Sequence, residues 1–269
     1  MNRRTFLFGA SVAAAGVVAG ARALARSGPP LEEQRLLLDA GLGLKTPLRL
    51  SLISDLHAGF FLEQERLQEA WASIRAFAPD LVLNAGDTVD RDPAAMGEVG
   101  WFFAELAAFA PTFAVLGNHD LRMDGRRVAR RLASAGVRVL RNELALLAVR
   151  DLEVSVCGAR DLTEERGPHA SALRHVPAGV FSILLAHHPE TLDQVDEDWN
   201  VGLLACGHSH GGQICLPGRV PVIGKVARAF APGLRRVRGR NVALTRGLGF
   251  AAVPVRLNCP PDVTHIEVI

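Results

Sequence analysis

The sequence predicts an α/β fold in which two packed β-sheets are covered by helices on the outside. In the first half of the chain, short apolar runs that end in polar clusters alternate with helix-like segments. The second half holds several strand-like runs in quick succession. Hydrophobic residues make up 49% of the 269 residues and charged residues 22%, which suffices for a large core. This arrangement is typical of sheets packed together beneath helices.

Hydrophobic periodicity places the individual elements. Residues 63–78 carry Leu67, Trp71 and Ile74 on one helical face, and residues 31–39 form a polar, helix-like piece ahead of a Gly-rich linker. The first half then predicts strand 48–57, helix 63–78, strand 81–87, helix 94–109, strand 112–120 and helix 126–135. The second half predicts strands over residues 137–140, 143–149, 152–158, 181–188, 201–208, 213–217, 241–247 and 264–269.

Residues 1–25 have the pattern of an export signal. Arg3 and Arg4 precede an apolar run over residues 6–20, and residues 23–25 give a small-x-small cleavage site. The arginine pair predicts export by the twin-arginine (Tat) pathway, with an ordinary Sec signal or an uncleaved anchor as alternatives. We expect the periplasm or cell envelope as the location, with membrane association as an option. The domain prediction is a signal peptide over 1–25, a linker over 26–46 and one domain over 47–269.

Charge and cysteine content exclude two kinds of protein. The chain has 30 Lys and Arg and 28 Asp and Glu, and removal of residues 1–25 takes away three arginines and no acid. The remaining charge is close to zero, so no nucleic-acid partner is expected. The four cysteines, Cys157, Cys206, Cys215 and Cys259, form no C-x-x-C pair. A structural zinc knuckle is therefore not expected, and the spacing assigns no disulfide.

Polar residues end five of the predicted strands. In α/β sheets, the carboxyl ends of the strands form the mouth where ligands bind. Imidazole, carboxylate and amide groups suit divalent ions of manganese, zinc, iron or nickel. Asp-x-His and His-x-His spacing would place both side chains on the same side of an extended strand end. The residues are Asp55, His57, Asp87, Asn118, His119, Asp120, His187, His188, His208 and His210.

One such residue alone is commonly a helix cap or a hydrogen-bonded surface residue. Five polar strand ends in order predict a metal site instead. The other three histidines, His169, His175 and His265, fall outside this pattern and are expected on the surface.

The order D-x-H, G-D, G-N-H-D, H-x-P and G-H-x-H resembles the calcineurin-like metallophosphoesterase superfamily. The motifs span Asp55 to His210, and the continuation G-H-S-H-G-G-Q-I-C-L-P resembles an exported bacterial phosphodiesterase branch. That branch is related to UDP-2,3-diacylglucosamine pyrophosphatase-like enzymes. The resemblance implies a four-layer αββα sandwich of two mixed β-sheets flanked by helices, the metallophosphoesterase fold.

The resemblance also implies a role for each residue. Two divalent ions would hold a bridging hydroxide that attacks the phosphorus of a phosphodiester or phosphomonoester. His119 would contact the phosphate or protonate the leaving group, oriented by Asp120. His187 is preferred to His188 as a ligand because it stands two residues before Pro189. The ligands would be Asp55, His57 and His210 for the first ion, Asn118, His187 and His208 for the second, and Asp87 for both.

The substrate is less well defined by the sequence. Residues 213–240 contain seven bases, no acid and interleaved apolar residues. Such a segment can lie on an anionic membrane surface or guide a lipid-linked phosphoester, and the alternative is a solvated basic loop. Arg246 and Arg256 are candidate phosphate contacts or, alternatively, members of structural ion pairs.

Two other functions remain open. A UDP-2,3-diacylglucosamine pyrophosphatase-type hydrolase is the first, although Tat export argues against a lipid step at the inner leaflet. A non-catalytic metal-binding scaffold is the second, although the complete ligand set and the His119–Asp120 pair argue against it. The sequence does not define the oligomeric state.

Overall fold

The computed structural model describes residues 28–164, 169–218, 220–221 and 230–269. The predicted signal peptide, residues 1–25, lies outside these residues, and so do Arg219, Lys225 and Arg228 of the basic segment. Among the helices that the structure describes, none is long and apolar enough to span a bilayer. Tat export therefore stays a prediction.

The first β-sheet contains both termini of the described fold. β14 runs antiparallel to β2, and every other neighbouring pair in this sheet is parallel, so the sheet is mixed. Its strands, in spatial order, are β1 (Glu32–Leu38), β14 (Asp262–Val268), β2 (Leu48–Ile53), β3 (Leu81–Asn84), β4 (Thr112–Ala114) and β5 (Arg138–Val139).

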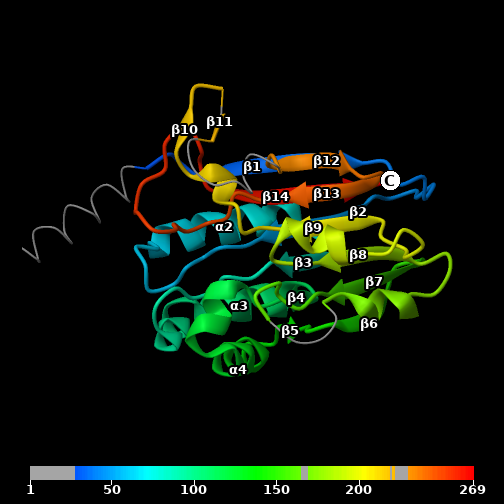
Figure 1. Cartoon of the computed structure of the whole chain (residues 1–269), viewed down its shortest axis with the longest axis horizontal. Helices are drawn as coiled ribbons and strands as arrows, with labels where there is room; N and C mark the ends of the chain where they lie inside the picture. The colour runs from blue at the N-terminus through cyan, green and yellow to red at the C-terminus, as the bar shows by residue number, and fades with distance from the viewer. Residues whose placement is uncertain (1–27, 165–168, 219, 222–229) are drawn as a thin grey trace, which may run out of the picture.

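The second β-sheet is parallel in the middle and antiparallel at both edges. Its strands, in spatial order, are β12 (Gly233–Val237), β13 (Arg240–Leu244), β9 (Leu203–Cys206), β8 (Phe181–Leu185), β7 (Leu152–Gly158) and β6 (Glu143–Val149). The small hairpin of β10 (Cys215–Leu216) and β11 (Val220–Pro221) projects away from both sheets (Figure 1). Two mixed sheets confirm the predicted fold class.

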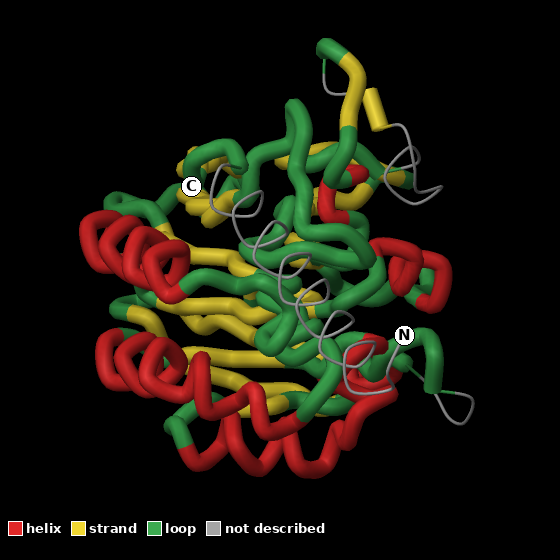
Figure 2. Tube along the Cα trace, turned by 90° about the vertical axis from the view of Figure 1, so that its left-hand side faces the viewer, coloured by secondary structure: helices red, strands yellow, loops and turns green. Residues whose placement is uncertain are grey.

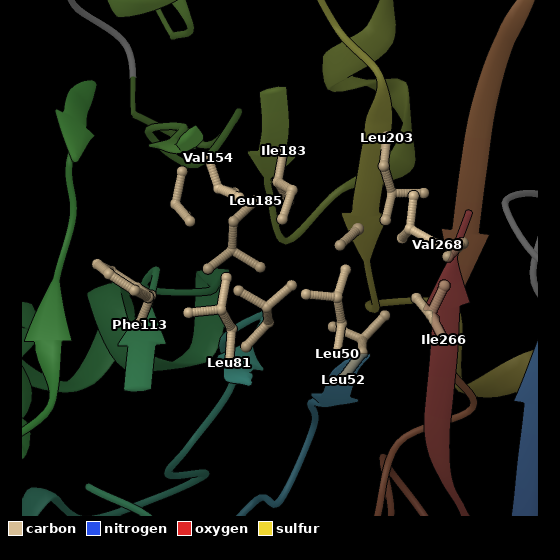
Figure 3. Packing of buried hydrophobic residues seen from close by; sticks show 14 of the residues in the cluster. Leu50, Leu52, Leu81, Phe113, Val154, Ile183, Leu185, Leu203, Ile266 and Val268 are labelled. Carbon is tan, nitrogen blue, oxygen red and sulfur yellow. The ribbon is translucent and has the colours of Figure 1, made fainter. Parts of the chain in front are cut away.

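Alternating side chains of the strands fill the space between the two sheets. Leu50 and Leu52 on β2 point towards the second sheet, where Ile183, Leu185 and Leu203 face them (Figure 3). All five side chains are fully buried. Burial of one such side chain contributes about 1.5–3 kcal/mol to the free energy of unfolding, so this layer contributes substantially to stability.

Helices cover the outer face of each sheet. The first sheet carries α2 (Gln64–Phe77), α3 (Met96–Phe109) and α4 (Asn118–Ser134), which lie on one side of the strands (Figure 2). The second sheet is covered by two 3₁₀ helices, η2 (Ser171–His175) and η3 (Pro189–Gln194), whose Leu173 and Leu192 pack on Leu184 and Leu204. Two further 3₁₀ turns are η1 (Pro93–Ala95) and η4 (His210–Gly212).

The structure corrects two predicted elements. Residues 31–39 do not form a helical piece, because Glu32–Leu38 is β1, an edge strand that pairs in parallel with β14. Part of the expected linker over residues 26–46 is thus a strand of the first sheet. The helix predicted to start at residue 126 starts at Asn118 instead, with a non-helical residue at Asp124. Asn118 and His119 consequently lie in the first turn of a helix.

His265 is a core residue, so the expectation of a surface histidine is wrong. It lies on β14 beneath α2, where Nδ1 is 2.9 Å from Ser51 Oγ and Nε2 is 2.9 Å from Ser73 Oγ. Its ring stacks on Phe77 with 4.2 Å between the ring centroids. Burial lowers the pKa of His265 to about 4, which keeps the ring neutral. Of the other two, His175 is exposed and His169 is half-buried.

Candidate metal centre

The seven predicted metal ligands converge at the carboxyl ends of strands from both sheets. Each ligand lies in the loop or helix turn that directly follows a strand. Asp55 and His57 follow β2, Asp87 follows β3, Asn118 follows β4, His187 follows β8, and His208 and His210 follow β9. The site therefore spans the seam between the two sheets.

The first group of ligands is Asp55, His57 and His210. The Nε2 atoms of His57 and His210 are 3.0 Å apart, and Asp55 Oδ1 is 3.4 Å from His210 Nε2 and 3.9 Å from His57 Nε2. Asp55 Oδ1 is buried and has no hydrogen-bond partner among the described residues. An orphaned carboxylate oxygen beside two imidazole nitrogens fits a divalent ion.

The second group is Asn118, His187 and His208. His187 Nε2 lies 3.1 Å from Asn118 Oδ1 and 3.1 Å from His208 Nδ1. All three of these atoms can offer a lone pair to a metal ion, as nitrogen and oxygen donors of first-row metals do.

Asp87 lies between the two groups. Its Oδ2 is 3.3 Å from His187 Nε2 and 3.7 Å from His57 Nε2. Its Oδ1 accepts a hydrogen bond of 2.8 Å from the backbone N–H of His119, in the first turn of α4. Gly117 permits this approach, since a Cβ there would overlap Asp87 Oδ1. One carboxylate thus reaches both groups of ligands.

The ligand loops leave the extended conformation. Five of the seven ligands have a positive φ, between 48° and 68°: Asp55, His57, Asp87, His208 and His210. The prediction that the D-x-H and H-x-H pairs share one side of an extended strand end is therefore wrong. Backbone hydrogen bonds between the loops after β2 and β3 stabilise this conformation. Asp55 N–H donates to Gly86 O, and His57 N–H donates to Asp87 O. Residues other than glycine adopt this region at a cost of about 1–3 kcal/mol each, usually at functional sites.

Second contacts fix the tautomers of two ligand histidines. His187 Nδ1 donates to Ala85 O at 2.8 Å, and His57 Nδ1 lies 3.1 Å from Asp90 Oδ1. In the neutral ring that a metal ion requires, the proton would stay on Nδ1 and the Nε2 lone pair would point into the site. Metal-binding histidines are oriented in this way by a carbonyl or a carboxylate.

The electrostatics of the site show how strongly these groups interact. Burial alone lowers the pKa of His187, but Asp87 and Asp55 outweigh this effect and raise the pKa to about 10. Burial together with His187 and His188 lowers the pKa of His208 to about 3. The pKa of Asp87 ends below its usual range, because the surrounding imidazoles outweigh the effect of burial. Such divergent pKa values are typical of a functional site.

Asp90, and not Asp120, contacts the ring of His119. The Nδ1 of His119 is 2.8 Å from Asp90 Oδ1, whereas both oxygens of Asp120 accept backbone N–H groups from Val89 and Gly117. The prediction that Asp120 orients His119 is thus corrected: Asp120 is a buried cap of α4. Asp90 could have been found in the sequence, as a second carboxylate three residues after Asp87.

His188 lines the site next to the second group of ligands. Its Nδ1 is 2.8 Å from Asp161 Oδ2, and its ring lies on that of His208 with 3.8 Å between centroids. Asp161 is fully buried and also accepts the backbone N–H of Thr163. Sequence reasoning missed Asp161, which lies far from every motif in the sequence.

The two candidate phosphate arginines are buried behind the site. Arg246 Nε is 3.0 Å from Asp262 Oδ2, and another of its nitrogens is 2.8 Å from Glu32 Oε2. Arg256 donates to several backbone carbonyls, including Gly249 O at 2.7 Å, and lies 3.4 Å from His210 Nδ1. Both residues are less than 5% exposed. They stabilise the loops that carry the ligands, and Arg246 forms the structural ion pairs that were the alternative to a phosphate contact.

Comparison with known proteins agrees with this geometry. Residues 48–212, well over half of the chain, match the family model described as calcineurin-like phosphoesterase.

The chain belongs to the calcineurin-like phosphoesterase family.

Members of this family that resemble the chain are found in several bacteria. Phosphodiesterase YaeI of Escherichia coli is 33% identical over an alignment of 241 residues that covers 83% of each chain. The metallophosphoesterase YkuE of Bacillus subtilis is 29% identical over 98% of this chain and 96% of its own. These similarities identify this calcineurin-like phosphoesterase as a metal-dependent phosphoester hydrolase.

A solved structure shows the same fold. The 5′-nucleotidase precursor from Thermus thermophilus superposes with a TM-score of 0.54 at 17% identity. The match covers 83% of this chain and 54% of that one, so this phosphoesterase spans about half the length of its structural neighbour.

Proposed function

We propose that the protein is a dinuclear-metal phosphodiesterase. Asp55, His57 and His210 would hold one divalent ion, Asn118, His187 and His208 the other, and Asp87 both. The observation that carries the proposal is the position of Asp87 Oδ2, which lies 3.3 Å from His187 Nε2 and 3.7 Å from His57 Nε2. Similarity to a protein named as a phosphodiesterase supports a diester as the substrate. The metals would be manganese, zinc, iron or nickel.

The chain's own residues would bind the phosphate and move the proton. When bound, two divalent ions neutralise phosphate charge and lower the pKa of a bound water. The side chain of His119 is 23% exposed, so a substrate can reach it. Nδ1 of His119 lies 2.8 Å from Asp90 Oδ1, so Nε2 would be the nitrogen available to the leaving-group oxygen. His119 would protonate that oxygen as the bond to phosphorus breaks.

Hydrolysis of bis(p-nitrophenyl) phosphate tests this function. Wild-type protein loaded with manganese is expected to release p-nitrophenolate, and His119→Ala is expected to lower kcat by about 10²–10⁴-fold. His175→Ala, on an exposed histidine away from the site, is the matched control and keeps wild-type activity. A wild type that is inert with manganese, zinc, iron and nickel would favour the non-catalytic scaffold.

An amphiphilic envelope substrate is the second part of the proposal. Leu216 of the basic segment and Leu257 are 57% and 54% exposed, and residues 214 and 257 form a β-bridge beside them. Within that segment, Arg235 and Arg236 are exposed, while Arg238 pairs with Asp193 and Arg240 donates to backbone carbonyls. The twin-arginine pattern supports export to the periplasm or cell envelope, where such substrates occur.

Binding to vesicles tests the amphiphilic substrate. We expect the protein to sediment with anionic vesicles and to stay in solution with neutral ones, since basic residues beside apolar ones favour anionic surfaces. Leu216→Asp is expected to weaken the binding. Absence of sedimentation with both kinds of vesicle would contradict the idea. A pyrophosphate diester assayed beside the phosphodiester would test the pyrophosphatase-type alternative.

A further inference from the structure

Two cysteines lie side by side next to the turn that carries His210. Cys215 opens strand β10, and Cys259 comes 44 residues later, in the segment before β14. Backbone hydrogen bonds hold the two segments together. Cys215 N–H donates to Leu257 O at 2.9 Å, and Leu257 N–H donates to Gln213 O at 2.9 Å.

Both thiols point at the same backbone oxygen. Cys215 Sγ is 3.3 Å from Gly211 O, and Cys259 Sγ is 3.4 Å from it. The two sulfur atoms are therefore at most 6.7 Å apart. Cys259 Sγ also lies 3.2 Å from His210 O. A rotation about the Cα–Cβ bonds would replace the contact with the shared carbonyl by a contact between the two sulfur atoms, which a disulfide brings to about 2.05 Å.

The pair lies just beneath the surface. Cys215 and Cys259 are 1% and 2% exposed, but their neighbours Leu216 and Leu257 are among the most exposed apolar residues of the described chain. The other two cysteines differ from this pair. Cys157 and Cys206 are fully buried in strands of the second sheet, where Cys206 Sγ faces Ala243 O.

We propose that Cys215 and Cys259 form a disulfide when the folded protein meets a disulfide oxidant such as oxidised glutathione. The thiolate of one cysteine attacks the oxidant and releases one glutathione thiol, which leaves a mixed disulfide. The thiolate of the second cysteine then attacks the protein sulfur and releases the second glutathione thiol. The protein loses two electrons and two protons, and the oxidant gains both. No disulfide joins any of the four cysteines in the structure.

The cross-link would join the segment around Cys259 to the start of the basic segment, beside the ligand turn. Residues 215–259 would become a closed loop that contains residues 215–240 of the basic segment. Closing a loop of this length reduces the entropy of the unfolded chain, so Tm is expected to rise by about 5–10 °C. This inference does not depend on the proposed hydrolytic activity.

Mass spectrometry of the full chain tests the pairing. The folded protein is treated with oxidised glutathione, its remaining thiols are alkylated in denaturant, and the product is digested with trypsin. Trypsin cuts after Arg174, Arg219 and Arg256. The expected product joins residues 175–219 to residues 257–269 and is two hydrogen atoms lighter than the two peptides together. Fragmentation must show an alkylated Cys206, which shares a peptide with Cys215.

Matched variants decide the outcome. Cys206→Ala is expected to keep the cross-link and the rise in Tm, whereas Cys215→Ala and Cys259→Ala are expected to lose both. Reductant should reverse the shift in wild type. Alkylation of both Cys215 and Cys259 after oxidation, mixed disulfides alone, or a link to Cys157 or Cys206 would overturn the proposal. If Cys259→Ala does not fold, the Cys215→Ala variant and the peptide masses of the wild type still show whether Cys215 and Cys259 pair.

Discussion

The layer between the two sheets and the loops at the strand ends are built in opposite ways. In the layer, side chains such as Leu50 and Ile183 are apolar, fully buried and carried by regular strands. In the loops, buried Asp and His side chains face one another, and five of the seven predicted ligands have a positive φ. Residues in that region each cost about 1–3 kcal/mol, so the loops store strain that the layer must offset.

The layer between the sheets therefore stabilises the fold, and the strand-end loops carry the groups for chemistry. Apolar burial between the sheets stabilises the fold and has no groups that bind an ion. The strand-end loops have the ion-binding groups and depend on the layer to hold their conformation. Substitutions in the layer should thus lower the free energy of unfolding, and substitutions in the loops should lower activity.

The largest expected effect on stability is at Leu50. Leu50→Ala leaves a cavity between the sheets and should lower the free energy of unfolding by about 2–5 kcal/mol. Urea unfolding measures it, and metal binding at low urea should be retained. Leu37→Ala, at a leucine 61% exposed on the edge strand β1, is the control and should change stability by less than about 0.5 kcal/mol. Equal losses of unfolding free energy at Leu50 and Leu37 would contradict the view that the layer between the sheets stabilises the fold.

His265 makes stability depend on pH from within the core. Its pKa is about 4 in the folded chain against an ordinary value of 6.5, so between these pH values the unfolded chain binds the proton more strongly. The free energy of unfolding should therefore fall as the pH drops from 6.5 towards 4, by up to about 3 kcal/mol. Urea unfolding of the metal-free protein at about pH 7 and about pH 4.5 measures this loss.

The control for this prediction is His265→Gln. Glutamine can hydrogen-bond to Ser51 or Ser73 but does not titrate, so the variant should lose less stability than wild type over the same pH interval. An identical pH dependence in both proteins would show that His265 does not contribute.

A smaller effect is expected at Asp90, which positions His119 and His57. Asp90→Asn should lower kcat by about 10–100-fold, the size that partners of metal-binding histidines show, with little change in unfolding. Asp120→Asn is the matched comparison. It removes an acceptor for the backbone N–H of Val89 or Gly117 and should lower the free energy of unfolding by about 1–3 kcal/mol. The opposite pattern would restore Asp120 as the residue that orients His119.

The sequence predicted the parts of the fold whose cause is local. Continuous apolar runs predicted strands such as β8 and β9, because strands buried on both faces need no polar positions. The ligand types could be predicted because each strand end carries an Asp, Asn or His in a fixed order. Convergence of these ends follows from sheets whose central strands are parallel.

Long-range contacts explain why some predictions from the sequence were wrong. Among the described strands, β1 pairs with β14, more than 200 residues away, and the polar sequence of residues 31–39 gives no sign of this partner. His265 and Arg246 owe their burial to partners on distant elements, Ser73 and Glu32. The positive φ of the ligands arises from hydrogen bonds between neighbouring loops, which no spacing within one motif reveals.

Anomalous diffraction from crystals soaked in manganese or zinc is the sharpest test of the dinuclear centre. We expect two peaks about 3.5–4 Å apart. One should lie among Asp55, His57 and His210, the other among Asn118, His187 and His208, with Asp87 touching both. A single peak, or peaks away from Asp87, would contradict a dinuclear centre.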